Sequence, residues 1–223
     1  MIIATSLSPT HSCRDNQITA INSWKKYGKC YSFNHPKELP LLSQYSGIQF
    51  VPTEDVSSFS NKPLIKISSF INYALTHNED LLIINSDIIL KDLPKFKDNG
   101  ITMLSRYDYN DNLDDNSLFL DGFDVFYIPK SILPIFPSSI FALGAAWHDF
   151  FTPMIAIKSN IPLYYPNGKY AFHKKHRIQY NYEEWLFLGD KFKNYFKLHP
   201  KLSIPQVAQN TMSLIQNNLI CEI

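Results

Sequence analysis

A polar triplet, Asn85-Ser86-Asp87, interrupts the aliphatic segment of residues 80–90. A continuous apolar run of this length predicts a strand buried on both faces of a largely parallel sheet. The triplet then lies at or just past the carboxyl end of that strand, where open α/β sheets bind their ligands. A carboxylate and an amide at this position can reach a phosphate or a metal ion. The alternative is that the triplet forms an ordinary turn, since Asn, Ser and Asp are common turn residues.

Two histidines could complete such a metal site. His173 and His176 lie in a basic segment, residues 173–177, which also contains Lys174, Lys175 and Arg177. Neutral imidazole is a common metal ligand. The alternative is that both histidines lie on the surface of a basic loop, whose charge simply attracts phosphates.

Three further carboxylates could take part in chemistry. Asp149 follows Gly144, Trp147 and His148, and small residues let a backbone come close to a ligand, so this segment could line a pocket. Asp149 could equally be an N-terminal helix residue that the helix dipole stabilises. The other two, Asp121 and Asp124, interrupt a β-prone stretch on either side of a glycine, a pattern typical of a bulge or of close approach by a ligand.

An alternation of strands and helices must position these residues. We expect strands at residues 1–7, 30–34, 48–51, 80–90, 101–104, 118–128 and 161–165, and helices at residues 12–27, 39–45, 61–75, 151–158, 183–196 and 206–219. Pro63 should lie in the first turn of its helix, where its missing N–H costs nothing. Residues 106–116 are polar and acidic, and we expect a solvated loop. The order predicts an α/β protein with a Rossmann-like, mostly parallel mixed sheet flanked by helices, and it places the triplet inside the sheet.

The composition limits the class of partner. The 223 residues, 45% of them apolar, are enough for one domain with a sizeable core. A net charge of +1 favours neither nucleic acid nor an anionic membrane as partner. Three widely spaced cysteines indicate neither a disulfide framework nor a thiolate zinc site. The first apolar run is too short for a signal peptide, and no run reaches the length of a membrane span, so we expect a cytoplasmic protein.

The order of elements over residues 2–177 resembles the GT-A fold of nucleotide-sugar-dependent glycosyltransferases. In that fold a strand near the middle of the chain ends in an Asp-x-Asp motif, which holds a divalent metal and the nucleotide diphosphate. Asn85-Ser86-Asp87 is similar, with the first aspartate replaced by asparagine, which removes one anionic ligand. The resemblance implies that Asp87 and His173, with His176 as a competitor, bind the metal. An imidazole ligand favours Mn²⁺ over Mg²⁺.

The resemblance also implies roles for other residues. The nucleotide-binding candidates are Thr5, Ser6, Asn34, Lys62 and Asn85. Asp149 would be the general base, with His148 as the alternative, and the acceptor or sugar would contact Asp121, Asp124, Trp147 and His148. The single GT-A-like domain, 1–223, would consist of a nucleotide-binding half (1–104), an acceptor half (105–180) and a C-terminal helical extension (181–223).

The function implied is transfer of a sugar from a nucleotide-sugar donor to a glycan or other hydroxyl acceptor. The alternative is a non-catalytic GT-A-like module that binds a nucleotide or a glycan, which the asparagine at position 85 favours. A nucleotidyltransferase would usually have a Gly-rich, basic loop after the first strand, where this chain has Ser8-Pro9.

Overall fold

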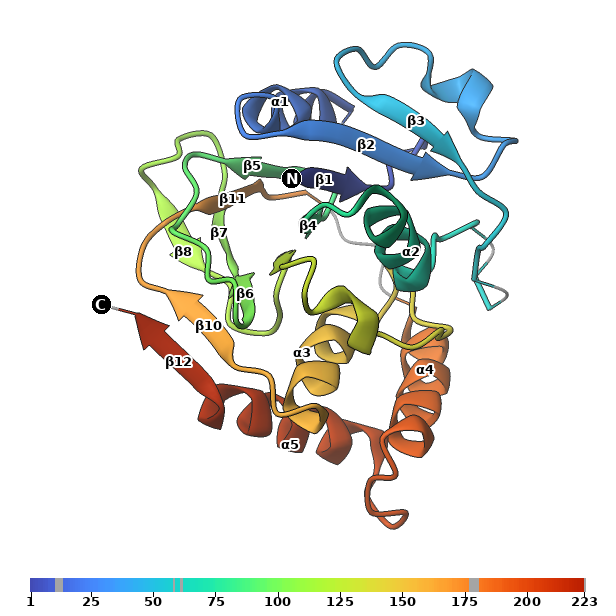
Figure 1. Cartoon of the computed structure of the whole chain (residues 1–223), viewed down its shortest axis with the longest axis vertical. Coiled ribbons are helices and arrows are strands. Elements are labelled where there is room, and N and C mark those ends of the chain that lie inside the picture. Colours follow the sequence, from blue (N-terminus) through green and yellow to red (C-terminus); the bar gives the residue numbers. More distant parts are fainter. Residues whose placement is uncertain (11–13, 58, 61, 177–180, 223) are drawn as a thin grey trace.

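The computed structural model describes residues 1–10, 14–57, 59–60, 62–176 and 181–222 (Figure 1). Within them, eight strands form a central sheet in the order β12-β10-β6-β9-β4-β1-β2-β3. Its members are β1 (Ile2–Thr5), β2 (Lys29–Asn34), β3 (Gln49–Pro52), β4 (Leu81–Ile84), β6 (Ile101–Leu104), β9 (Val125–Ile128), β10 (Leu163–Pro166) and β12 (Leu219–Glu222). β9 pairs antiparallel with β4 and β6, and the other neighbours pair in parallel. The predicted mostly parallel mixed sheet is confirmed.

Alternation along the central strands explains why they are apolar throughout. In β4, Leu81 and Ile83 belong to one hydrophobic cluster, while Leu82 and Ile84 belong to a second cluster on the opposite face. All four side chains are fully buried. Both faces of the sheet are therefore covered, as expected for a strand without polar positions.

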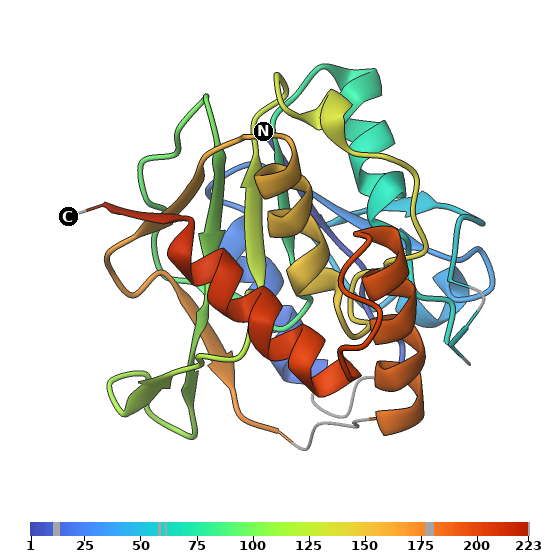
Figure 2. The same cartoon turned by 90° about the horizontal axis from the view of Figure 1, so that it is seen from below.

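Helices cover the two faces unequally (Figures 1 and 2). The first cluster contains residues of α2 (Ile67–His77), α3 (His148–Lys158), α4 (Tyr182–Tyr195) and α5 (Ile204–Asn217). The second contains residues of α1 (Arg14–Trp24) and of a smaller sheet. Two short 3₁₀ helices, Leu39–Leu42 and Leu133–Ile135, lie in the connections. Among the described residues, none of the helices is long and apolar enough to cross a bilayer.

The smaller sheet brings distant segments together. Its order is β5-β11-β7-β8, with β5 (Ile88–Leu90), β7 (Arg106–Tyr109), β8 (Asn116–Leu118) and β11 (Ala171–Lys174). β11 is antiparallel to β5 and parallel to β7. In this register His173 lies opposite Ile88 on one side and Asp108 on the other. The turn after β4 thus meets a segment more than eighty residues further along the chain.

Several predicted elements need correction. Residues 106–116, expected to be a solvated loop, contain β7 and the start of β8. Residues 80–90 form two strands, because the chain leaves the central sheet at the triplet and enters the smaller one. The stretch 118–128 is also divided, with β9 beginning at Val125. Residues 39–45 contain only a 3₁₀ turn among the described residues, and β12 was not predicted.

The helix expected at residues 61–75 begins only at Ile67, so Pro63 lies before it. The preceding residues make isolated β-bridges instead, Val56 with Ile65 and Lys66 with Ala142. The predicted helix start at residue 12 and residue 61 lie outside the described residues. The division into two halves and an extension stays a prediction, although the segment 181–223 contributes β12 to the central sheet.

Candidate functional site

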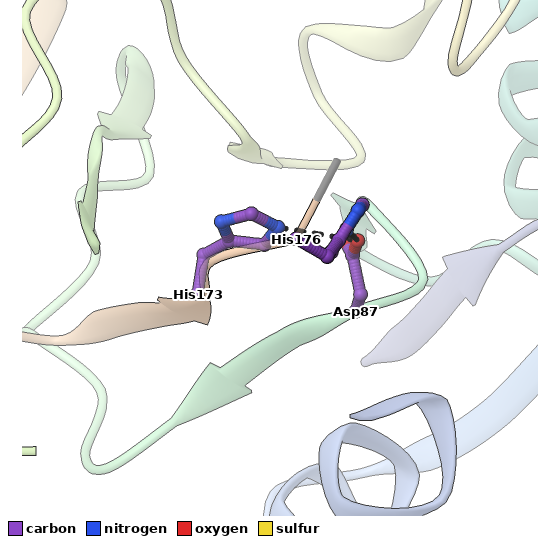
Figure 3. A group of neighbouring side chains, drawn as sticks. All are labelled: Asp87, His173 and His176. Carbon is purple, nitrogen blue, oxygen red and sulfur yellow. Dashed lines mark hydrogen bonds and ion pairs between the residues drawn. The ribbon is translucent and has the colours of Figure 1, made fainter. Parts of the chain in front are cut away.

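One aspartate and two histidines converge at the carboxyl end of β4 (Figure 3). Asp87 lies in the turn between β4 and β5, His173 lies on β11, and His176 follows β11. The Asp87 Oδ2 atom is 2.9 Å from His176 Nε2 and 3.4 Å from His173 Nε2. One ligand atom from each residue lies within 4.8 Å of the others. The sequence-predicted metal ligands, and the competitor His176, are brought together.

The strand register explains this convergence. A tight turn, in which the Ile88 N–H donates to the Asn85 carbonyl at 3.2 Å, leads the chain from β4 into β5. Because His173 lies opposite Ile88 in the antiparallel β5–β11 pair, its side chain comes beside Asp87. The site is therefore built by pairing between strands.

The other side of the His173 ring is fixed by Asp108 on β7. His173 Nδ1 lies 2.8 Å from Asp108 Oδ1. Burial alone would raise the pKa of Asp108, but hydrogen bonds from Arg106 and His173 lower it below its ordinary value. An ionised carboxylate can only accept, so this contact favours a proton on His173 Nδ1, and Nε2 is the ring nitrogen that faces Asp87.

Arg106 connects this pair to Asp124 and Asn85. Its Nε donates to Asp108 Oδ1 at 2.8 Å, and its terminal nitrogen donates to both oxygens of Asp124 at 3.1 Å. Asp124 Oδ1 also accepts the Asn85 side-chain amide at 2.6 Å. The Asp124 side chain is 5% exposed and that of Arg106 is 12% exposed. A buried network of hydrogen bonds thus connects His173 to Asn85 of the triplet.

The converging atoms favour a cation. With its proton on Nδ1, a neutral His173 directs the Nε2 lone pair at the Asp87 carboxylate. Two electron-rich groups at this separation are favourable only when a positive charge lies between them, either a metal ion or a second proton on the imidazole. One carboxylate oxygen and two imidazole nitrogens form a donor set that suits a divalent transition metal.

Asp149 lies in the first turn of α3, near enough to Asp124 to feel its charge. A Cβ atom built on Gly122 would overlap its Oδ2 atom, so the carboxylate packs directly against the Gly122 backbone. Burial, together with the negative charge of Asp124, raises the pKa of Asp149 to about 6. His148 is also buried, and its Nδ1 contacts the Ala145 carbonyl at 2.6 Å. Its Nε2 has no hydrogen-bond partner among the described residues.

The predicted nucleotide contacts at the ends of β1 and β2 differ in their availability. Asn34 is buried and already bonded, since its amide donates to the Leu7 carbonyl at 2.8 Å and its oxygen accepts from Ser32. Thr5 is buried with its hydroxyl unpaired within the described part of the chain, and Ser6 is half-buried. Asn34 therefore shapes this loop through its own contacts.

The remaining candidates differ in their exposure. Lys62 is exposed, and its charge lowers the pKa of Glu184, which burial raises overall. Asp121 is exposed. Trp147 is 3% exposed and its ring packs against Trp185 and other aromatic rings, so it offers little surface to a sugar. Arg177 lies outside the described residues.

Sequence reasoning missed two residues of the network, Arg106 and Asp108, because the charge content of their segment predicts a loop. It also missed Gln17, a buried side chain of α1 that contacts Ser86 at 2.8 Å and Tyr45 at 2.5 Å. The available signal for Arg106 and Asp108 was the period-two alternation of polar and aromatic residues at 106–109, which is typical of a strand. A lone glutamine on a helix carries no comparable signal.

Comparisons with known proteins do not assign a function to this chain. No protein-family model and no curated protein matches this chain. A solved structure of CTP:phosphocholine cytidylyltransferase from Streptococcus pneumoniae aligns over 86% of this chain and 98% of its own, with 12% identity and a TM-score of 0.36. A likeness this slight carries no function to this chain.

Proposed function

We propose that this protein is a metal-dependent glycosyltransferase of the GT-A type, which transfers a sugar from a nucleotide-sugar donor to a hydroxyl acceptor. The observation that carries the proposal is the convergence of Asp87, His173 and His176 at the carboxyl end of a central strand. This is the edge at which open α/β sheets bind ligands.

The donor set fits a divalent ion, with Mn²⁺ favoured over Mg²⁺ by the two imidazoles. Asp87 would bind it through a carboxylate oxygen and His173 through Nε2, which already faces Asp87. His176 Nε2, which lies 2.9 Å from the Asp87 carboxylate, would give up its proton to become the third ligand. When bound, the ion would neutralise the negative charge that develops on a diphosphate leaving group.

Asp149 is the proposed general base. It packs against Gly122, and Asp124, two residues further on, bonds to Asn85 of the triplet. Asp124 thus connects the surroundings of the proposed base to the triplet that contains Asp87. With a pKa of about 6, Asp149 is ionised at neutral pH and can accept the proton of an acceptor hydroxyl.

The neighbouring strand ends supply the proposed nucleotide contacts. Thr5 ends β1 and Ser6 follows it. β1 pairs with β4, and Asn85 begins the turn after β4. Lys62 would contact a phosphate, and Asp121 and His148 would contact the acceptor or the sugar. His148 offers a buried nitrogen with no partner among the described residues.

Calorimetric titration with a panel of nucleoside diphosphates and nucleotide sugars, with and without Mn²⁺, tests the proposal. We expect one nucleotide to bind only with the metal, and this binding to be lost in Asp87→Ala while thermal unfolding stays cooperative. The matched control is Asp111→Ala, since the Asp111 side chain is 98% exposed. Equal metal-dependent binding by Asp87→Ala would contradict the proposal.

Turnover separates the proposed enzyme from a binding module. With Mn²⁺ and no acceptor, a glycosyltransferase slowly hydrolyses its donor, because water replaces the hydroxyl. Nucleotide release should therefore be detectable with the nucleotide sugar that binds. A protein that binds a nucleotide sugar but neither hydrolyses nor transfers it would be the non-catalytic module.

A further inference from the structure

The side of the His173 ring that faces away from Asp87 is held by a hydrogen bond to a carboxylate. Asp108 Oδ1 accepts two hydrogen bonds, from His173 Nδ1 and from Arg106 Nε, each at 2.8 Å. The side chains of His173 and Asp108 are 6% and 17% exposed, so water competes weakly for either group. The ring is therefore held from behind by a single carboxylate oxygen.

Fixing one ring nitrogen decides what the other can do. A histidine that donates Nδ1–H to a carboxylate keeps Nε2 free of its proton in the neutral ring, and this partner also fixes the ring orientation. His173 Nε2 is the atom that faces Asp87 Oδ2, at 3.4 Å. The Asp108 contact thus prepares the atom that the metal site needs.

Arg106 in turn holds Asp108. Its guanidinium bridges Asp108 and Asp124 and lies over the Phe119 ring, 3.9 Å from the ring centroid. A planar guanidinium can bind two carboxylates in fixed directions, whereas a lysine ammonium acts as one point charge. Arg106 therefore orients Asp108 and also neutralises buried negative charge that would otherwise have no cation beside it.

We propose that Asp108 and Arg106 are positioning residues of the metal site: Asp108 holds His173 in the tautomer that presents Nε2, and Arg106 fixes Asp108. The inference rests on the proposed function for its purpose, but the tautomer can be measured without any metal.

The first test is made on the metal-free protein. Long-range ¹H–¹⁵N correlation spectra of ¹⁵N-histidine-labelled protein at about pH 8, where an ordinary imidazole is neutral, show which ring nitrogen carries the proton. The His173 signals are identified by their loss in His173→Gln. We expect a proton on Nδ1 in the native protein and in Asp111→Ala, whether or not Nε2 also carries one, and a loss or partial loss of the Nδ1 proton in Asp108→Ala. An Nε2–H tautomer in the native protein would overturn the proposal.

The second test measures Mn²⁺ affinity by titration. Loss of a carboxylate behind a metal-binding histidine typically weakens binding about 10–100-fold, and we expect this for Asp108→Ala. Asp108→Asn should recover most of the affinity, because one amide oxygen can accept both hydrogen bonds that Asp108 Oδ1 accepts. Arg106→Lys keeps a positive charge but not the bridge, so its affinity should fall between those of the native protein and Asp108→Ala.

The outcomes distinguish the two proposals. If the native protein binds no metal but shows the Nδ1–H tautomer, which Asp108→Ala loses, the proposed function fails while the positioning contact stands. If the native protein binds Mn²⁺ and transfers sugar, but Asp108→Ala binds as tightly, the positioning role is wrong and the function stands. Native affinity in Arg106→Lys would remove Arg106 from the proposal.

Discussion

Replacing Arg106 with methionine would leave two carboxylates without the cation between them. The side chains of Asp124 and Asp108 are 5% and 17% exposed. Asp124 would keep the Asn85 amide and Asp108 would keep His173. Removing one partner of a buried ion pair costs about 3–5 kcal/mol, because an uncompensated buried charge remains. Methionine keeps an apolar stem against Phe119, so we assign the loss in unfolding free energy at neutral pH to charge.

The loss should depend on pH in a definite direction. In the native protein burial raises the pKa of Asp108, but the bonds from Arg106 and His173 outweigh it and lower that pKa overall. Its stabilising contribution is therefore present above the unfolded pKa of about 3.9 and is lost as the pH falls through the folded value. Without Arg106 the Asp108 carboxylate takes up a proton at higher pH in the folded state, which relieves part of the unpaired charge. The difference between the two proteins should shrink as the pH approaches about 4.

Urea unfolding in EDTA, at neutral pH and at about pH 4.5, measures both effects, since the chelator removes any contribution from a bound metal. Lys91→Met is the matched control, because Lys91 is an exposed cation 5.9 Å from the centroid of the Phe172 ring. Its effect should stay within about 0.5 kcal/mol. A loss below about 1 kcal/mol for Arg106→Met, or a loss equal at both pH values, would refute the argument from buried charge.

Two further predictions concern Asp149. Asp149→Asn should lower kcat by about 10²–10⁴ and remove the acid limb of the pH–rate profile, in which the native activity falls as the pH drops through about 6. Asp149→Asn should also raise the unfolding free energy at neutral pH by about 1–3 kcal/mol, because the raised pKa means that the folded protein disfavours the ionised form of Asp149. Urea unfolding measures this difference. Gly122→Ala should displace the Asp149 carboxylate, because the added Cβ would overlap it. Its kcat should fall while circular dichroism shows a native fold, and unchanged kcat would show that this carboxylate has no role.

The position of the triplet was predictable because its signals are local. The aliphatic run of β4 is buried on both faces, and three strands precede it in the sequence. The side chains of Asp87 and Asn85 consequently lie at the carboxyl end of a central strand, as predicted. The path of the chain beyond the triplet was not predictable from the run, since the next aliphatics, Ile88–Leu90, enter a different sheet.

The network was not predictable because its contacts are distant in sequence. Arg106 reaches Asp124 across 18 residues, and Asp108 meets His173 across 65. Their own segment, Arg-Tyr-Asp-Tyr, alternates with the period of a strand, which places Arg106 and Asp108 on the same face. The charge content of residues 106–116 obscured that pattern. A charged side chain can lie in a buried strand only when it has a partner. The sequence does not show which residue that partner is.

The hydrogen-bond network explains why an asparagine, and not an aspartate, is favourable at position 85. Its side-chain nitrogen donates to Asp124 Oδ1 at 2.6 Å, and Asp124 is nearly buried. A carboxylate at position 85 would place two negative charges at this separation, beside a single guanidinium that Asp108 also shares. The amide satisfies Asp124 without adding charge, and Arg106 remains sufficient for the two aspartates. The asparagine at position 85 is therefore coupled to Asp124, while Asp87, two residues further on, has its carboxylate facing two histidines.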